Sequence, residues 1–167
     1  MMKIDNCFIL CAGMGTRMGE IGNTLPKMLW PIFSKTLLDL QISYAKELGA
    51  RRIFINVHHH HDKIIQYLDE NEVAGVEVLF EKELLDVGGA VHNLIIKKGL
   101  GRDEKILLLN GDQFLFFDNC FFDELYKLAY ENDFVLIGTQ VNSNLGYNKL
   151  LLQDSYLKSI VRPPHKE

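Results

Sequence analysis

The chain has 167 residues, which is the size of one ordinary domain and enough to bury a hydrophobic core. Hydrophobic residues make up 47% and charged residues 24%, a globular balance that excludes a disordered chain or a coiled coil. The formal net charge of -4 argues against a nucleic-acid partner, because nucleic-acid backbones are held by clustered Lys and Arg. We therefore expect a soluble protein with a small-molecule partner.

The cysteines and the amino-terminal sequence bear on the cellular compartment. Cys7, Cys11 and Cys120 form no CxxC pair, and an odd count without a secretory leader provides no disulfide framework. The apolar run within residues 1–10 is too short for a membrane span. We expect reduced thiols, a cytoplasmic location and no membrane partner.

Short apolar runs bounded by turn residues alternate with stretches of helical period, which is typical of βα units around a parallel sheet. Gly49 is placed to stop one helix, and Asp62 is placed to cap the next. In chain order the expected elements are strand 6–11, helix 36–48, strand 52–57, helix 62–71, strand 76–80, helix 88–98, strand 105–109, helix 121–131, and strands 134–138, 149–152 and 157–161.

The run 105–109 is densely aliphatic, which predicts a central strand buried on both faces. The chain contains no repeat or linker, so we expect a single domain over residues 1–167. The predicted fold is a three-layer αβα, Rossmann-like α/β domain. Its doubly wound sheet is mainly parallel, with a mixed edge formed by the last strands. If the short C-terminal region leaves this sheet edge incomplete, its unpaired backbone groups favour self-association, and we expect a homo-oligomer.

The loop after the first strand, with the sequence LCAGMGTRM, is the first candidate site. Ala12, Gly13 and Gly15 let backbone N–H groups approach a phosphate chain. Arg17 and the later Lys27 supply positive charge to neutralise it. For the glycine pair taken alone, a plain surface turn is an equal alternative.

Two well-known phosphate-binding motifs do not fit this loop. A Walker loop needs Lys followed by Ser or Thr after its second Gly, whereas Thr16 and Arg17 stand there. A dinucleotide-binding fingerprint needs Gly where Met18 stands. An NAD-dependent or P-loop enzyme is therefore disfavoured.

The run from Leu10 to Pro31 resembles the signature of the sugar-phosphate nucleotidylyltransferases, approximately LAAGxGTRM, then PK, then a short apolar segment ending in Pro. Three further stretches match in the same order: INVHH from Ile55, LLDVGGA from Leu84 and LLNGD from Leu108. The resemblance covers essentially the whole chain. It is greatest to the branch with N-acetylmuramate-1-phosphate uridylyltransferases and mannose-1-phosphate guanylyltransferases.

The resemblance implies roles for particular residues. Arg17 and Lys27 contact the phosphates, and Asp112 is the metal-binding Asp; these three are the implied catalytic residues. An acid just past a parallel strand lies in the crevice where such sheets bind ligands, and carboxylate oxygens suit Mg²⁺. A solvated Asn-Gly-Asp turn is the alternative for Asp112. The implied nucleotide-binding residues are Ala12, Gly13, Gly15, Thr16, Arg17, Glu81, Gly88 and Gly89.

Glu81 and the glycine pair bear on the base. Gly88 and Gly89 open a helix in the segment where the family contacts the base, and Val87 stands where relatives usually have Thr. Glu81 falls near a position where some relatives read the base with Gln. A carboxylate only accepts hydrogen bonds, which favours guanine or cytosine over uracil. A solvated strand end is the alternative for Glu81.

The end of the chain matches the family less closely. Gly146 and Arg162 fall at the spacing of family segments that contact the sugar phosphate, with Arg162 in place of a Lys and Val161 in place of an acid. Family members continue further and supply a second metal-binding Asp. We therefore expect this chain to lack the C-terminal part of the family domain.

The four consecutive histidines His58 to His61 invite interpretation as a metal site. Adjacent residues in a strand point to opposite faces, and no nearby Cys completes a ligand set. A polar strand-to-helix turn is the favoured interpretation.

The resemblance implies a Mg²⁺-dependent nucleotidyltransferase that condenses a nucleoside triphosphate with a sugar 1-phosphate and releases pyrophosphate. One alternative is a truncated or degenerate nucleotide-binding module with a regulatory or interaction role. Another is a cytidylyltransferase acting on phosphocholine. The sequence does not determine the base, the sugar or the oligomeric state.

Overall fold

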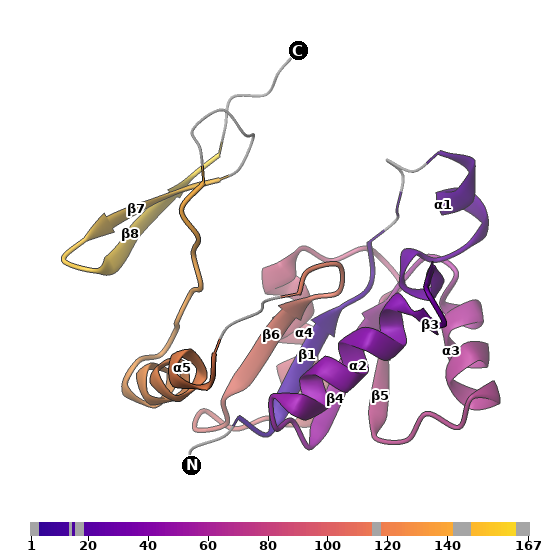
Figure 1. The fold of residues 1–167 in the computed structure, drawn as a ribbon, viewed down its shortest axis with the longest axis horizontal. Helices are drawn as coiled ribbons and strands as arrows, with labels where there is room; N and C mark the ends of the chain where they lie inside the picture. The colour runs from indigo at the N-terminus through magenta and orange to yellow at the C-terminus, as the bar shows by residue number, and fades with distance from the viewer. Residues whose placement is uncertain (1–3, 14, 16–18, 115–117, 142–147, 163–167) are drawn as a thin grey trace. The chain divides into compact units, whose positions relative to one another are not determined.

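A computed structural model describes residues 4–13, 15, 19–114, 118–141 and 148–162 (Figure 1). Its internal contacts divide the chain into two compact units, Met1–Asn132 and Asp133–Glu167. The sequence pattern predicted no boundary at this point. The two units are described separately below.

Four parallel strands form the sheet of the first unit in the order β5-β4-β1-β6. They are β1 (Asn6–Leu10), β4 (Arg52–Val57), β5 (Val76–Phe80) and β6 (Ile106–Asn110). In the register, Phe8 of β1 lies between Phe54 of β4 and Leu108 of β6. Because all four strands run the same way, their carboxyl ends meet at one edge of the sheet.

The remaining elements of the first unit are α1 (Glu20–Thr24), the 3₁₀ helix η2 (Lys27–Leu29), β2 (Pro31–Ile32), β3 (Lys35–Thr36), α2 (Leu37–Glu47), α3 (His61–Glu70), α4 (Val87–Lys98) and α5 (Asn119–Glu131). Strands β2 and β3 pair with each other in a short antiparallel ribbon. Leu48 is the C-cap of α2, and Gly49 follows with φ 94°, the left-handed conformation expected of a helix stop. That prediction is confirmed.

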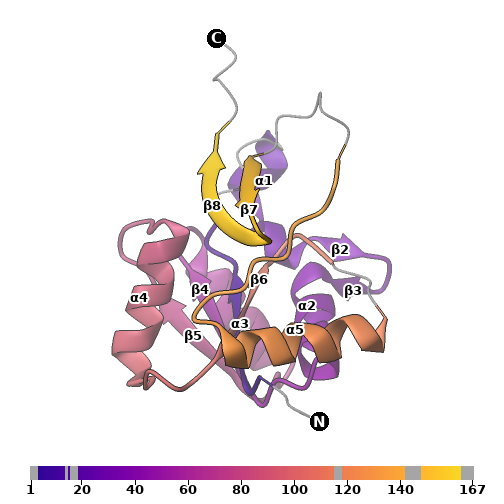
Figure 2. The same ribbon diagram turned by 90° about the vertical axis from the view of Figure 1, so that its left-hand side faces the viewer.

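Helices cover both faces of the sheet (Figure 2). On one face, alternate residues such as Cys7, Ile9 and Ile55 pack against α2 and α3. On the other face, Phe8 and Phe54 pack against α4. This alternation follows from the two-residue period of a strand, which sends successive side chains to opposite faces. The predicted three-layer, doubly wound α/β fold is confirmed.

The strand after α4 was predicted to be a central strand of the sheet, and that prediction was wrong. Strand β6 pairs with β1 alone in the described sheet, so it is an edge strand rather than a central one. Leu109 is buried, but Leu108 is 37% exposed. Helix α4 packs on Phe8, Phe54 and Leu79, which belong to β1, β4 and β5, and this covering extends less far over β6. An aliphatic run therefore did not guarantee burial on both faces.

The beginning of α3 also differs from the prediction. Its N-cap is His60, in a left-handed conformation with φ 53°, and the helix begins at His61. Asp62 lies inside the first turn, where its negative charge complements the helix dipole instead of capping the first N–H groups.

The second unit contains one hairpin, of β7 (Lys149–Gln153) and β8 (Tyr156–Val161). The two strands were expected, but they pair antiparallel in a sheet of their own, so the described residues do not form the expected mixed edge. Residues 134–138 were predicted to be a strand and have no regular secondary structure. No described strand pairs with them, and a strand needs such a neighbour for its hydrogen bonds.

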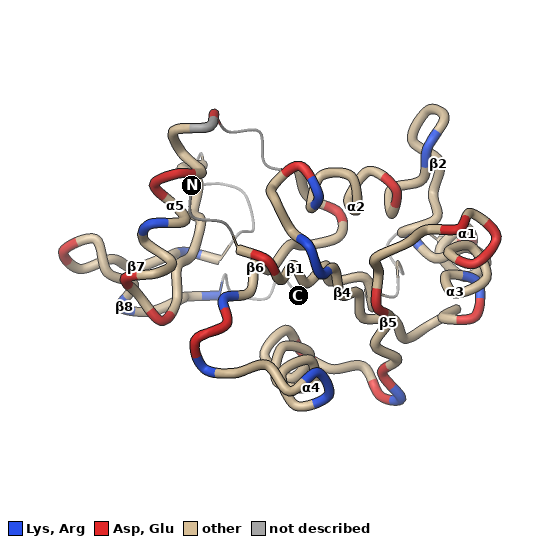
Figure 3. The backbone as a smooth tube through the Cα atoms, turned by 90° about the horizontal axis from the view of Figure 1, so that it is seen from below, with Lys and Arg blue, Asp and Glu red and all other residues tan. Residues whose placement is uncertain are grey.

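Acidic and basic positions are interspersed within the first unit rather than gathered into a basic patch (Figure 3). None of the helices in the described part of the chain has both the length and the apolar character needed to cross a bilayer.

Asp39 joins the start of α2 to α3. Its Oδ2 accepts hydrogen bonds from the Thr36 backbone N–H at 2.9 Å and the Tyr67 hydroxyl at 2.6 Å, while its own N–H donates to Thr36 Oγ1 at 3.1 Å. Burial raises the pKa of Asp39, but the hydrogen bonds from Tyr67 and Thr36 outweigh burial and hold the pKa below its ordinary value of 3.8.

We expect Asp39→Ala to lower the free energy of unfolding by about 1 kcal/mol at pH 7, because the Thr36 N–H and the Tyr67 hydroxyl lose the carboxylate that accepts their hydrogen bonds. Because the folded-state pKa is lowered, this stabilisation is present above pH 3.8 and is lost as the pH falls through the folded-state value. Urea denaturation between pH 3 and pH 7 measures the difference. Asp69→Ala, at an exposed position on α3, is the control, and a difference that grows in acid contradicts the prediction.

Candidate functional site

A cleft of about 580 Å³ opens at the carboxyl edge of the parallel sheet. It lies where β4 and β6 flank β1 on opposite sides, the point at which ligands bind in open α/β sheets. Its lining includes Cys11, Ala12, Gly13 and Gly15 after β1, Lys27 and Met28 of η2, Asn56 of β4, Leu84, Leu85 and Val87 before and at the start of α4, and Asn110, Gly111 and Asp112 at the end of β6.

Lys27 and Asp112 form an ion pair in this cleft. The Lys27 Nζ lies 2.6 Å from Asp112 Oδ2, and the two side chains are 35% and 48% exposed. Eighty-five positions separate the two residues in the sequence. The structure therefore brings together two residues that the sequence predicted for one site, and both remain accessible to a ligand.

Glycines permit close backbone packing around the cleft. Gly15 has φ 64°, a conformation that residues with a side chain rarely adopt. A Cβ added to Gly22 in α1 would collide with the carbonyl oxygen of Gly15. A Cβ added to Gly111 would lie 2.6 Å from the Leu10 carbonyl oxygen and 2.8 Å from Met28 Sδ. The loop after β1, the segment after it and the end of β6 thus meet without intervening side chains.

Cys11 has no sign of reactivity despite its place in the lining. Burial, and to a smaller degree the neighbouring Cys7, raises the pKa of the Cys11 thiol well above its ordinary value. A thiol in that state is a poor nucleophile and behaves as a small apolar side chain. It replaces the family's Ala without adding chemistry.

Glu81 is not a lining residue of the cleft, which differs from its expected contact with the base. The side chain is 2% exposed. Its Oε1 accepts a hydrogen bond from Asn56 Nδ2 at 2.8 Å, and its Oε2 accepts one from the Leu85 N–H at 3.1 Å. Both oxygens are engaged with the protein, and the contact of Glu81 with a base stays a prediction.

The other predicted residues are distributed as follows. Ala12, Gly13, Gly15, Lys27 and Asp112 line the cleft together. Gly88 and Gly89 lie in the first turn of α4, between the lining residues Val87 and Ala90. Thr16, Arg17 and Gly146 lie outside the described residues. Arg162 follows β8 in the second unit and is exposed.

Two of the four histidines connect the turn between β4 and α3 to other segments by hydrogen bonds. His58 Nδ1 donates to the Glu81 carbonyl at 2.9 Å, and His60 Nε2 donates to the Asn23 carbonyl at 2.8 Å. Within the described ranges, no group of three or more His, Cys, Asp or Glu side chains is arranged to hold a metal ion.

Sequence reasoning missed Asn56 as a site residue. Its Oδ1 accepts a hydrogen bond from the Cys11 N–H at 2.7 Å, although the residue is only 3% exposed. The available signal was a polar residue within the otherwise apolar part of β4, IFINV. Buried polar side chains need hydrogen-bond partners, so such a residue marks a specific contact.

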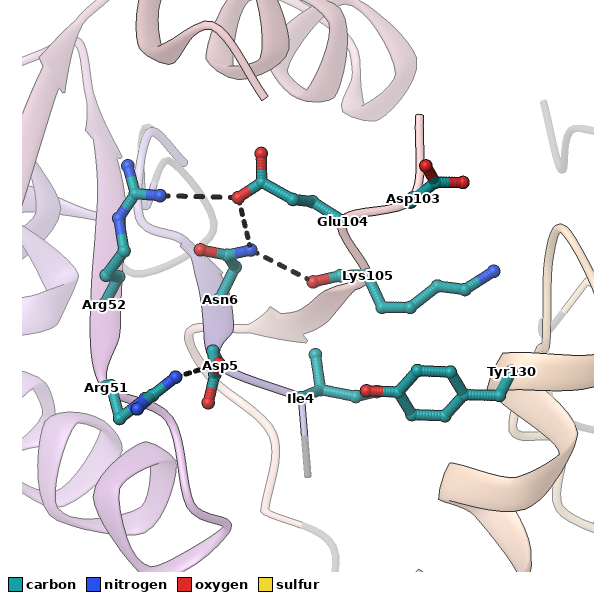
Figure 4. Close-up of a pocket in the computed structure, with 9 residues that line it drawn as sticks. All are labelled: Ile4, Asp5, Asn6, Arg51, Arg52, Asp103, Glu104, Lys105 and Tyr130. Atoms are coloured by element: carbon teal, nitrogen blue, oxygen red, sulfur yellow. Dashed lines mark hydrogen bonds and ion pairs between the residues drawn. The ribbon is translucent and has the colours of Figure 1, made fainter. Parts of the chain in front are cut away.

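A second cavity, of about 430 Å³, lies at the opposite, amino-terminal edge of the sheet (Figure 4). Both of its arginines are paired with an acid: Arg51 pairs with Asp5, and Arg52 lies 3.5 Å from Glu104. Lys105 donates to the Asn132 carbonyl. The glycine-lined cleft at the carboxyl edge is therefore the stronger candidate site.

The family model described as "Nucleotidyl transferase" matches residues 7–147, which is most of the chain. The chain belongs to the nucleotidyl transferase family. That match includes all the lining segments of the cleft.

Known relatives agree with this assignment. The chain is 31% identical over 162 residues to the bifunctional protein GlmU of Methanococcus maripaludis, covering 97% of this chain and 36% of that protein. It is 32% identical over 114 residues to a D-glycero-alpha-D-manno-heptose 1-phosphate guanylyltransferase of Campylobacter jejuni, covering 66% of this chain and 48% of that protein. The chain thus spans between about a third and a half of these relatives.

Among solved structures, HddC from Yersinia pseudotuberculosis superposes with a TM-score of 0.78 at 26% identity, covering 96% of this chain and 70% of that chain. The same protein has been solved in complex with GMP-PN, with a TM-score of 0.76.

We expect Gly111→Ala to lower the free energy of unfolding by about 1–3 kcal/mol, because the added methyl group overlaps backbone and Met28 atoms that cannot both move away. Chemical denaturation measures the change. Gly101→Ala is the matched control, since its Cβ meets only Glu104 Oε2 at 3.9 Å, an ordinary contact. Equal stability of the two variants would show that the carboxyl edge is more loosely packed than described.

Proposed function

We propose that this chain binds a nucleoside triphosphate with Mg²⁺ in the cleft and transfers the nucleoside monophosphate to a sugar 1-phosphate. The observation that carries the proposal is the Lys27–Asp112 ion pair beside a glycine loop in one cleft. A cation suits the phosphates, a carboxylate suits the metal, and glycines allow backbone N–H groups to approach. Membership of the nucleotidyl transferase family supports the same reaction class.

Separation of the Lys27–Asp112 ion pair costs little free energy. Both side chains are at least one-third exposed, and ion pairs of that kind contribute about 0–1 kcal/mol to stability. A magnesium nucleotide offers each residue a replacement partner of opposite charge. Lys27 then neutralises phosphate, and Asp112 neutralises the metal, so neither charge is left unpaired when the ligand enters.

Asp112 fits the proposed metal because its carboxylate is accessible in the cleft. Magnesium bound with nucleotides is held by one or two carboxylates, the substrate phosphates and water. When bound, the ion neutralises charge on the departing pyrophosphate. Asp112 would be the protein ligand among the described residues of the cleft.

The reaction requires positioning more than acid–base chemistry. An oxygen of the sugar 1-phosphate attacks the α-phosphorus, a new P–O bond forms, and the bond between the α-phosphorus and the bridging oxygen breaks to release pyrophosphate. A phosphate monoester, with a second pKa of about 6, is largely dianionic at neutral pH and needs no protein base. The glycine loop and Lys27 orient and neutralise the phosphates.

The base and the acceptor are open to a direct test. The similarity to a guanylyltransferase and to HddC, solved with GMP-PN, makes GTP the first nucleotide to try. Pyrophosphate release from four nucleoside triphosphates with several sugar 1-phosphates and phosphocholine measures both choices. Turnover supports the transferase, and nucleotide binding without turnover supports a binding module.

We expect Lys27→Ala and Asp112→Asn each to lower kcat/KM by about 100-fold, since each removes a charge that faces the reacting phosphates or their metal. The measurement is pyrophosphate release at saturating Mg²⁺. Lys98→Ala is a matched control, because it removes another close ion pair, at 2.7 Å to Glu77, and neither of these residues lines the cleft. An unchanged rate in both cleft variants rejects the assignment.

Removal of the metal gives a separate prediction. With excess EDTA, nucleotide affinity measured by calorimetry is expected to fall by about tenfold or more in the wild type, because Asp112 would hold the ion that neutralises the phosphates. In Asp112→Asn the effect of EDTA should be much smaller. An equal effect in both proteins contradicts the assignment of Asp112 as the metal ligand.

A further inference from the structure

Glu81 is part of a buried chain of hydrogen bonds that joins two parts of the cleft. The Cys11 N–H donates to Asn56 Oδ1 at 2.7 Å, Asn56 Nδ2 donates to Glu81 Oε1 at 2.8 Å, and the Leu85 N–H donates to Glu81 Oε2 at 3.1 Å. Asn56 and Glu81 are 3% and 2% exposed. Cys11 begins the glycine loop, and Leu85 belongs to the lining segment before α4.

The backbone of Glu81 is held as firmly as its side chain. The Glu81 N–H donates to the Val57 carbonyl at 2.8 Å, and the Glu81 carbonyl accepts from His58 Nδ1 at 2.9 Å. Both partners belong to β4 or to the residue directly after it. The carboxylate is therefore aimed inward from a fixed position beside the sheet.

Donors and acceptors can be arranged in only one way along this series of hydrogen bonds. Its two ends are backbone N–H groups, which only donate, so the side-chain pair must present an acceptor at each end. An Asn has one acceptor and one donor. With Asn56 Oδ1 facing Cys11, its amide faces Glu81, and residue 81 must then accept on both sides. A carboxylate meets that condition and a neutral amide does not.

We infer that Glu81, acting through Asn56, is a positioning residue that sets the glycine loop against the Leu84–Val87 segment for nucleotide binding. This inference rests on the proposed function. Glu81 itself need not touch the nucleotide, since its oxygens are both engaged within the protein. Its effect passes through the two backbone segments that line the cleft.

An exchange of the two side-chain types tests the inference. Glu81→Gln places an amide donor against either Asn56 or Leu85, and Asn56→Asp places two acceptors against each other. The double variant restores the pattern. Its new carboxylate at position 56 accepts from the Cys11 N–H and from the new side-chain amide at position 81, and the oxygen of that amide accepts from the Leu85 N–H. Glu83→Gln, an exposed position in the same segment, is the matched control.

Two measurements are made on each variant. Hydrogen exchange by NMR reports the protection of the Cys11 and Leu85 amides without any ligand, and calorimetry reports the Kd of the nucleotide that the wild type binds most tightly. We expect each single variant to lose about tenfold or more in amide protection and in affinity, because a buried donor or acceptor is left unpaired. The double variant should recover both to within about threefold, and Glu83→Gln should match the wild type.

The possible results separate clearly. Affinity that stays at the wild-type value in folded single variants overturns the inference, and so does recovery of amide protection in the double variant without recovery of affinity. The second result would give Glu81 a direct contact with the nucleotide. If a single variant does not fold, a folded double variant with near wild-type affinity still supports the inference, and a weak one overturns it. A wild type that binds none of the nucleotides instead refutes the proposed function, on which the inference depends.

Discussion

The parallel pairing of β1 with both β4 and β6 is the constraint on which the cleft depends. Three strands that run the same way must end at one edge, and the loops that leave them are forced into proximity. The chain enters β4 and later returns to the other side of β1 at β6, so the connections diverge and leave a crevice. Apolar packing on both faces holds the three strands in this register.

At that edge, small residues and polar side chains have complementary roles. Gly22 and Gly111 let backbone segments meet at distances that a Cβ would prevent. Gly15 instead adopts a left-handed conformation, with φ 64°, that side chains disfavour. Lys27 and Asp112 then face each other with no bulky neighbour between them. Behind this exposed pair, the buried Asn56 and Glu81 side chains tie the loops together, and burial strengthens such hydrogen bonds while making any mismatch costly.

The charged side chains at the two edges of the sheet differ in their pairing and in their accessibility. At the amino-terminal edge, Arg51 and Arg52 are each paired with an acid, which neutralises a cavity of appreciable size. At the carboxyl edge the Lys27–Asp112 pair is accessible, and glycines let backbone segments of the cleft pack closely.

Much of the fold followed from local pattern. The bounds of β4 and β5 and the stop of α2 at Gly49 are consequences of hydrophobic period and backbone freedom, which act within a few residues. The same holds for the recognition of the glycine loop, Lys27 and Asp112, which a spaced motif identifies. Three features were decided only by tertiary structure: within the described sheet β6 became an edge strand, residues 134–138 lie beside no described strand that pairs with them, and Glu81 turned inward to Asn56. Each depends on a neighbour distant in sequence, and the pairing of distant groups depends on how the whole chain packs, which no local pattern contains.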